Sequence, residues 1–289
     1  MFLGYNTNGF AHHRLEDAVE ILAELGYGGI ALTLDVHHLD PFALDLPVQT
    51  ASLARQLARH NMRCVIETGA RFLLDSRHKH QPTLVSPTPE ERAKRVDFLK
   101  RCIDIAADLN ADCVSFWSGT AADNAPGGVQ MVRLIDRIER VAEYAVERNI
   151  PLAFEPEPGM YIDTMAKFAE LHAGVNHPCV GLTMDVGHLV CNRELPVSKF
   201  LTDWQHVLWN VHLEDMEPGI HDHLMFGEGE VDFADVFAGL RAANYSAGVY
   251  VELSRHSYDA VNTARKALTF LEPYLVEANA TATGWPFQG

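Results

Sequence analysis

The stretch LWNVHLEDMEPGIHDHLMFGEGEVDF, from Leu208 to Phe233, joins an apolar run to a group of histidines and carboxylates. Leu208–Leu213 has the length and the apolar content of a short buried strand. His212 then lies at the carboxyl end of that strand, and His221 and His223 lie in the loop that follows it. Enzymes built on parallel strands place their reactive side chains at this end. The stretch therefore predicts a metal-dependent site there.

The same alternation of a short apolar run and a longer helical segment continues along the whole chain, with Gly, Pro, Asn or Asp at each change. The predicted strands are Phe2–Asn6, Gly29–Leu34, Arg63–Glu67, Cys113–Trp117, Leu152–Glu155, Gly181–Asp185, Leu208–Leu213 and Gly248–Leu253. The clearest helices are Leu15–Leu25, Val48–His60, Pro89–Leu109, Val129–Arg148, Thr164–Ala173 and Tyr258–Tyr274. Eight such repeats predict a single α/β domain, a (β/α)8 TIM barrel with parallel strands.

An open, doubly wound sheet is the alternative fold. It is disfavoured because YNTNGF, at the end of the first strand, lacks the glycine spacing that cradles a pyrophosphate. We expect the barrel to span residues 1–275 and a C-terminal extension to span residues 276–289. Trp285 and Phe287 in that extension would cover their own barrel or contact a neighbouring subunit of a homo-oligomer.

Composition and charge limit the classes of partner. The chain has 289 residues and a formal net charge of -16, which disfavours a nucleic-acid partner. No apolar run reaches the roughly 20 residues that a membrane span needs, and the N-terminus has no leader pattern. The five cysteines are not closely paired, as expected for reduced thiols. We therefore expect a cytoplasmic protein without a membrane or nucleic-acid partner.

Polar side chains follow each predicted strand. They are Asn6 and Asn8; Asp35, His37 and His38; Glu67; Trp117 and Ser118; Glu155 and Glu157; Asp185 and His188; His212 and Asp215; Glu252 and Arg255. Four of them, on consecutive strands, offer three carboxylates and one imidazole: Glu155, Asp185, His212 and Glu252. Such ligands suit Mn²⁺, Mg²⁺ or Co²⁺ and do not exclude Zn²⁺. Each could instead cap a helix or pair with a basic residue, but four together favour one divalent cation.

Five segments near these residues carry a family resemblance: FEPEPG, MDVGH, NVHLED, HDHLMFGEGEVDF and VYVELS. The chain resembles the xylose-isomerase-like TIM-barrel superfamily, which includes sugar isomerases, epimerases and endonuclease IV. The resemblance implies that Glu155, Asp185, His212 and Glu252 bind the metal. In the ketose 3-epimerases of that superfamily, the residues matching Glu155 and Glu252 also move protons.

The resemblance implies a divalent-metal-dependent sugar or polyol isomerase or epimerase. Its reaction would abstract a proton next to a carbonyl and pass through an enediolate that the metal stabilises. A dehydratase of a keto-polyol, which is a lyase, shares this first step and is the main alternative. A metabolite-binding barrel without catalysis, or a subunit of a C-glycoside-cleaving complex, is a more distant one.

An endonuclease is a weaker match. HDHLMFGEG has the D-x-H-x-x-x-G spacing of the third-zinc loop of endonuclease IV, with His221 in place of Asp. The histidines that bind the first zinc of that enzyme have no counterpart here, where Glu67 and Trp117 stand nearby. The negative charge also disfavours DNA binding.

Other residues near the strand ends are predicted to contact the substrate: Glu157, His188, His221, His223, Trp117 and Arg255. The three histidines among them could alternatively hold a second metal ion. Trp117 could equally be part of the barrel core. The loop Thr68–Thr88 is longer than barrel loops usually are, which suggests a substrate lid. Its basic residues could meet a phosphate or carboxylate, or could simply be solvated: Arg71, His78, Lys79 and His80.

Overall fold

Eight parallel strands close into a barrel in the computed structural model, which describes residues 1–280. Around the barrel the strands follow the order β1-β10-β7-β6-β5-β4-β3-β2. The first strand closes the ring, because it pairs with β2 through Gly4 and Gly29 and with β10 through Leu3 and Val249. The predicted TIM barrel is confirmed.

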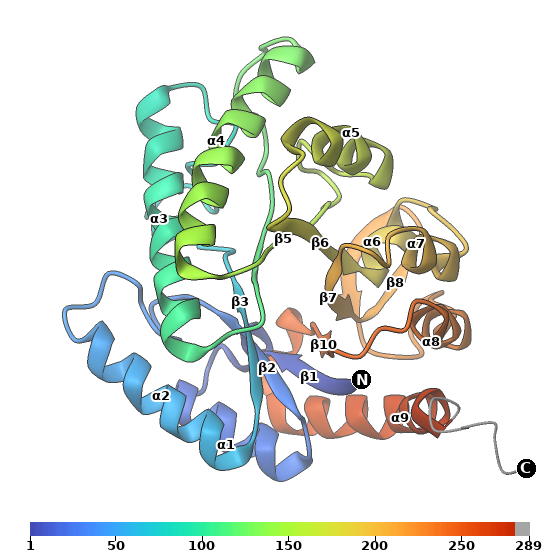
Figure 1. Cartoon of the computed structure of the whole chain (residues 1–289). Coiled ribbons are helices and arrows are strands. Elements are labelled where there is room, and N and C mark those ends of the chain that lie inside the picture. Colours follow the sequence, from blue (N-terminus) through green and yellow to red (C-terminus); the bar gives the residue numbers. More distant parts are fainter. Residues whose placement is uncertain (281–289) are drawn as a thin grey trace, which may run out of the picture.

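The barrel strands are β1 (Phe2–Asn6), β2 (Gly29–Thr33), β3 (Arg63–Glu67), β4 (Val114–Phe116), β5 (Leu152–Phe154), β6 (Val180–Asp185), β7 (Leu208–Leu213) and β10 (Gly248–Val251). The helices are α1 (Leu15–Leu25), α2 (Leu46–His60), α3 (Pro89–Leu109), α4 (Gly127–Arg148), α5 (Met165–Val175), α6 (Val186–Cys191), α7 (Val197–Asp203), α8 (Phe233–Ala242) and α9 (Ala260–Ala280). Two 3-10 helices, η1 (Thr7–Phe10) and η2 (Ser254–Asp259), follow β1 and β10. The helices surround the strands (Figure 1).

Local sequence explains where the helices end. An asparagine in the left-handed conformation follows each of α2, α3, α4 and α5: Asn61, Asn110, Asn149 and Asn176. Asparagine tolerates this conformation better than most residues, and it stops the helix there. The chain then turns back into the next strand within a few residues. These turns lead into β3, β4, β5 and β6, which run parallel with their carboxyl ends at one mouth.

Two segments differ from the sequence-based expectation. The segment after β7 contains an antiparallel hairpin, β8 (Asp215–Glu217) and β9 (Ile220–Leu224), and His221 and His223 lie on its second strand rather than in an irregular loop. The last helix was expected to end at Tyr274 but continues to Ala280. The expected boundary between residues 275 and 276 thus falls inside α9, where Ala278 is buried.

The end of α9 lies beside the start of the chain. The amino group of Met1 donates to Asn279 Oδ1 at 3.3 Å, and Asn279 Nδ2 donates back to the carbonyl of Met1. Trp285 and Phe287 lie outside the described residues. The division of the chain at residue 275 stays a prediction.

Two further features concern composition. All five cysteines are free, as the sequence predicts. Within residues 1–280, the helices are too short or too polar to cross a membrane.

Candidate metal centre

Four side chains at the carboxyl ends of neighbouring strands form what we call the ligand quartet: Glu155, Asp185, His212 and Glu252. Glu155 and Glu252 directly follow β5 and β10, whereas Asp185 and His212 lie in β6 and β7. The strand register places Asp185 and Tyr250 on either side of His212. One ligand atom from each of the four residues lies within 4.8 Å of all the others. The quartet predicted from sequence is thus brought to one point.

The imidazole of His212 is the centre of the quartet. Its Nδ1 lies 3.0 Å from Glu155 Oε1, 3.2 Å from Glu252 Oε2 and 3.9 Å from Asp185 Oδ2. Its other nitrogen, Nε2, lies 2.9 Å from Glu67 Oε1 on the opposite side of the ring. His212 is only 1% exposed. The ring therefore presents Nδ1, and not Nε2, to the three carboxylates of the quartet.

The donors of the quartet fit a divalent cation. Three carboxylates and one imidazole are a ligand set that Mn²⁺, Mg²⁺, Co²⁺ and Zn²⁺ accept. Asp185 Oδ2 is buried and has no hydrogen-bond partner among the described residues, although burying such an atom alone is costly. A cation at the quartet would satisfy it.

The electrostatics of the quartet without a cation are unfavourable. Burial raises the pKa of Glu155 to about 8, although His212 opposes this. Burial also acts to raise the pKa of Glu252, but His212, His223 and Asn8 bring it below its usual value. The pKa of His212 is raised, because Glu67 and Glu155 outweigh the effect of burial. Burial and the nearness of like charges thus oppose ionisation of all three carboxyls, and a divalent cation would offset this.

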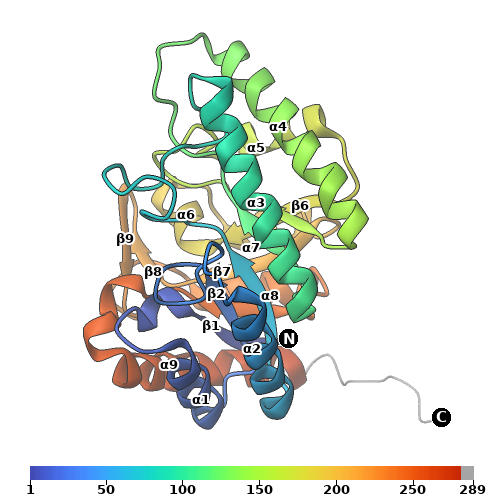
Figure 2. The same cartoon turned by 90° about the vertical axis from the view of Figure 1, so that its left-hand side faces the viewer.

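The quartet lies in a cavity of about 380 Å³. Its other lining residues are Asn6, Asn8, Thr33, Glu67, Gly69, Arg71, Lys79, His80, Trp117, Glu157, His188, His221, His223, Ser254 and Arg255. The long loop, residues 68–88, and the hairpin β8–β9 lie on the same side of the molecule and both contribute to this lining (Figure 2). Closure of the long loop over a substrate stays a prediction. The cavity volume is within the range of small-molecule sites.

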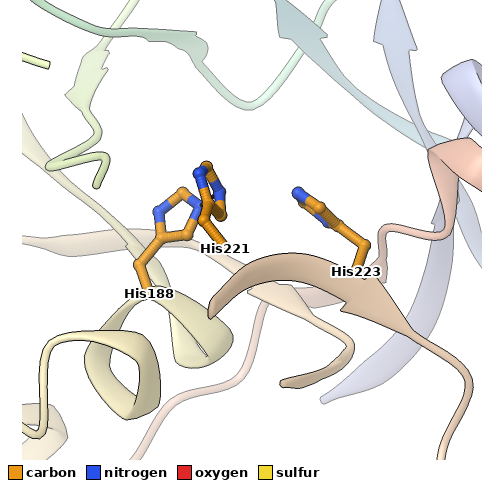
Figure 3. A group of neighbouring side chains, drawn as sticks. All are labelled: His188, His221 and His223. Atoms are coloured by element: carbon orange, nitrogen blue, oxygen red, sulfur yellow. Dashed lines mark hydrogen bonds between the residues drawn. The ribbon is translucent and has the colours of Figure 1, made fainter. Parts of the chain in front are cut away.

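Three histidines form a second group, which we call the histidine cluster: His188 of α6 with His221 and His223 of β9 (Figure 3). His221 Nε2 lies 3.0 Å from His188 Nε2. Nδ1 of His188 donates to the carbonyl of Pro156, and Nδ1 of His223 donates to the carbonyl of Glu252. With these protons on Nδ1, the Nε2 atoms of both rings are acceptors: that of His188 faces His221 Nε2, and that of His223 could accept a hydrogen bond or bind a metal ion. One nitrogen from each ring lies within 4.8 Å of the other two.

The remaining predicted substrate residues line the same cavity at different depths. Burial raises the pKa of Glu157 well above its usual value. Trp117 is 6% exposed, and the guanidinium of Arg95 lies 4.3 Å from its ring centre. Arg255 is more exposed and pairs with Asp222 at 2.5 Å. Trp117 therefore both lines the cavity and packs in the protein core, whereas Arg255 lies at the rim of the cavity.

Some strand-end residues have roles that their sequence position does not reveal. Asn8 Nδ2 donates to Glu252 Oε1 at 2.8 Å, which orients that carboxylate. Asp215 does not line the cavity; its carboxylate accepts from the amides of Gly227 and Val231 and holds the segment after the hairpin. Glu214 is fully buried, and both of its carboxyl oxygens lack a hydrogen-bond partner among the described residues. A buried strand that ends in acids was the only signal for Glu214.

The chain is similar to known proteins of one family. A family model described as xylose isomerase-like TIM barrel matches residues 19–274. L-ribulose-5-phosphate 3-epimerase UlaE of Shigella flexneri is 23% identical over 220 residues, which are 75% of this chain and 77% of UlaE. The family match confirms the resemblance that the sequence motifs indicate.

Two solved structures have the same fold. D-allulose 3-epimerase from Methylomonas sp. in complex with D-allulose has a TM-score of 0.76 at 20% identity, and the match covers 95% of this chain and 97% of that one. The IOLI protein with a binding zinc atom has a TM-score of 0.75 at 16% identity, and the match covers 99% of this chain and all of that one. At these identities the likeness shows the fold alone.

Proposed function

Because the chain belongs to the xylose isomerase-like TIM-barrel family, we propose that it is a sugar epimerase or isomerase that depends on a divalent cation. The single observation that carries this proposal is the convergence of the ligand quartet within 4.8 Å at the bottom of the cavity. The similarity to a ketose-phosphate 3-epimerase favours epimerisation of a ketose or a ketose phosphate. Mn²⁺, Mg²⁺ and Co²⁺ suit the three carboxylates and one imidazole, and Zn²⁺ also fits.

Glu155 and Glu252 would carry the proton transfers. They follow β5 and β10, which are separated around the barrel by β6 and β7, so their carboxylates approach the centre from different sides. A bound divalent cation would polarise the substrate carbonyl and make the neighbouring C–H more acidic. One glutamate removes that proton, and the other returns a proton to the opposite face. Asn8, which donates to Glu252 Oε1, leaves Oε2 of that carboxylate toward the centre.

The test is hydrogen exchange at the substrate. Purified protein with Mn²⁺ in deuterated water should exchange one C–H hydrogen of a ketose or ketose phosphate for deuterium. EDTA should stop this exchange. A panel of ketoses, their phosphates and keto-inositols covers the expected substrates. No exchange with any of them would contradict the proposal. An unsaturated product that absorbs ultraviolet light would instead indicate the dehydratase.

The histidine cluster is assigned to substrate hydroxyls in this proposal. The Nε2 lone pair of His223, and that of His188 if the substrate displaces His221, would accept hydrogen bonds from those hydroxyls. A second divalent cation is the alternative occupant, because the three rings could also bind a metal ion. Counting metal ions per chain separates these roles. If the histidine cluster contacts substrate, the wild type and His221→Ala should each bind one ion per chain. If the cluster holds a second metal ion, the wild type should bind two ions and His221→Ala should bind one.

A further inference from the structure

Glu67 forms a contact with the ligand quartet across the barrel. It ends β3, whereas His212 lies in β7, and the two residues are 145 positions apart in sequence. Glu67 Oε1 lies 2.9 Å from His212 Nε2 and 3.3 Å from Asn210 Nδ2. Glu67 is 6% exposed and His212 is 1% exposed, so water has little access to compete for either group.

The contact between Glu67 and His212 favours a proton on Nε2, whereas Nδ1, 3.0 Å from Glu155 Oε1, faces the point where a cation would take the place of a proton. An unprotonated Nε2 would place its lone pair 2.9 Å from the lone pairs of a carboxylate, and a buried repulsion of that kind is costly. With a proton on Nε2, the contact becomes a hydrogen bond donated to a charged acceptor, which is stronger than a neutral one. The carboxylate of Glu67 therefore favours the proton on Nε2.

The position of that proton decides what Nδ1 can do. A neutral imidazole carries one proton, so a proton on Nε2 leaves a lone pair on Nδ1. Nδ1 is the nitrogen that faces Glu155, Asp185 and Glu252. The opposite tautomer would direct an N–H at the point where the cation binds and would remove one of the four ligands.

Asn210 lies beside the same contact. Its amide Nδ2 lies 3.1 Å from His212 Nε2, 3.3 Å from Glu67 Oε1 and 3.4 Å from Thr183 Oγ1. A proton on Nε2 requires the two amide hydrogens to point at the oxygens of Glu67 and Thr183 rather than at the ring. Asn210 is fully buried and lies on β7 two residues before His212. One oxygen of Glu67 thus accepts from an amide and from the ring, and the amide holds the carboxylate in place.

We propose that Glu67 is a positioning residue that prepares His212 to bind a divalent cation through Nδ1. This inference rests on the proposed function, because it concerns the cation of the ligand quartet. Glu67 acts through His212 and does not bind the cation itself. A carboxylate that accepts from a metal-bound histidine also makes the ring a better ligand.

The first measurement is the affinity for Mn²⁺ by isothermal titration calorimetry. Glu67→Gln keeps the size of the side chain but removes its charge, and it should weaken Mn²⁺ binding about 10- to 100-fold. Glu157→Gln is the control, since it replaces another carboxyl group that lines the cavity and that forms none of the described hydrogen bonds or ion pairs of the His212 ring. Glu157→Gln should change the Mn²⁺ affinity by no more than about threefold, which is less than the loss expected when a carboxylate that supports a metal-bound histidine is removed.

The second measurement needs no substitution. Nitrogen-15 NMR of histidine-labelled wild-type protein with Zn²⁺ as a diamagnetic probe should show His212 protonated at Nε2 and metal-bound at Nδ1. A proton on Nδ1, an unchanged Mn²⁺ affinity in Glu67→Gln, or an equal loss in both variants would overturn the inference. These outcomes presuppose that the wild type binds the cation. If it binds none, the proposed function fails as well, and the two failures are thereby distinguished.

Discussion

The ligand quartet and the histidine cluster share one cavity but are built differently. The quartet comes from four neighbouring barrel strands, and its Glu155, Asp185 and His212 are at most 6% exposed. The cluster comes from the short helix α6 and the hairpin β8–β9, which lies outside the barrel sheet. Only His188 of the cluster is buried to a similar degree.

This difference separates two tasks of the site. The hydrogen-bond register of the barrel fixes the quartet, so its geometry changes only if the sheet changes. The hairpin is held by contacts outside the barrel sheet, such as those of His221 with His188 and of Asp222 with Arg255. We therefore expect the quartet to set the chemistry and the hairpin to set the fit of the substrate, so that each can vary without the other.

The largest expected effect separates the two regions by turnover. Glu155→Gln and Glu252→Gln should each lower kcat about 10²- to 10⁴-fold, because each removes a group that we propose transfers a proton. His223→Ala should raise KM more than it lowers kcat, because it removes a contact that we propose the substrate makes. Steady-state kinetics of the three variants on one ketose measures both constants. Equal losses of kcat in all three would show that the hairpin belongs to the chemical machinery.

Metal removal gives the next largest effect, on stability. Mn²⁺ at about 100 times its Kd should add about 2.7 kcal/mol to the free energy of unfolding, because it binds only the folded quartet. The physical source is the relief of repulsion among buried carboxylates. Thermal unfolding with and without Mn²⁺ measures the shift in Tm.

Two variants sharpen this measurement. Asp185→Asn removes a ligand of the quartet and should lose most of the Mn²⁺-dependent shift. His221→Ala changes only the cluster and should retain it. Loss of the shift in His221→Ala would contradict the separation of the two regions.

The sequence predicts the barrel and the quartet for the same reason. Apolar runs followed by Asp185 or Glu252 mark strand ends, and parallel strands bring their ends to one mouth whatever the loops between them do. The residues that stop the helices, such as Asn110 and Asn149, are also local signals. The roles of the substrate residues stay predictions, although most of their side chains line the expected cavity.

Two features could not be predicted in this way. The hairpin has no regular alternation of apolar and polar residues, because β9 (Ile220–Leu224) is only partly covered and packs little apolar surface. The contact of Glu67 with His212 joins β3 to β7 through the barrel interior, so it depends on the closed geometry rather than on any local pattern. Both features are tertiary, and both act on the site.

A smaller effect is expected where the hairpin returns to the barrel. A Cβ at Gly229 would lie 2.4 Å from Asp215 Oδ1 and 2.6 Å from the amide nitrogen of Met216. Gly229→Ala should therefore displace this segment and lower the free energy of unfolding by about 1 to 3 kcal/mol. It should also raise KM while leaving the Mn²⁺ affinity within a factor of about three, well under the loss expected when a group supporting the metal is removed.

Denaturant unfolding and calorimetry check both parts of this prediction. Gly128→Ala in α4 is the control, since a Cβ there meets nothing within 4 Å. It should be neutral or slightly stabilising, because alanine suits a helix better than glycine. A large loss of Mn²⁺ affinity in Gly229→Ala would show that the hairpin also supports the quartet.

The smallest expected effect concerns His80, which belongs to neither region. Its ring lies edge-on to Trp117 with ring centres 5.3 Å apart, and Nδ1 donates to the carbonyl of Gly69. Burial lowers the pKa of His80 to about 4. Between about pH 6.5 and pH 4, the His80 ring is protonated in the unfolded chain but not in the folded one. The contribution of His80 to the free energy of unfolding therefore falls as the pH falls. For His80 alone, the free energy of unfolding falls by about 1 kcal/mol from pH 7 to pH 5.5.

Denaturant unfolding at these two pH values checks the prediction. The fall in the free energy of unfolding should be about 1 kcal/mol smaller in His80→Gln than in the wild type. An NMR titration of the His80 ring should also give a midpoint well below 6.5. A midpoint near 6.5 would mean that the long loop leaves His80 in water, and its place in the cavity wall would then be wrong.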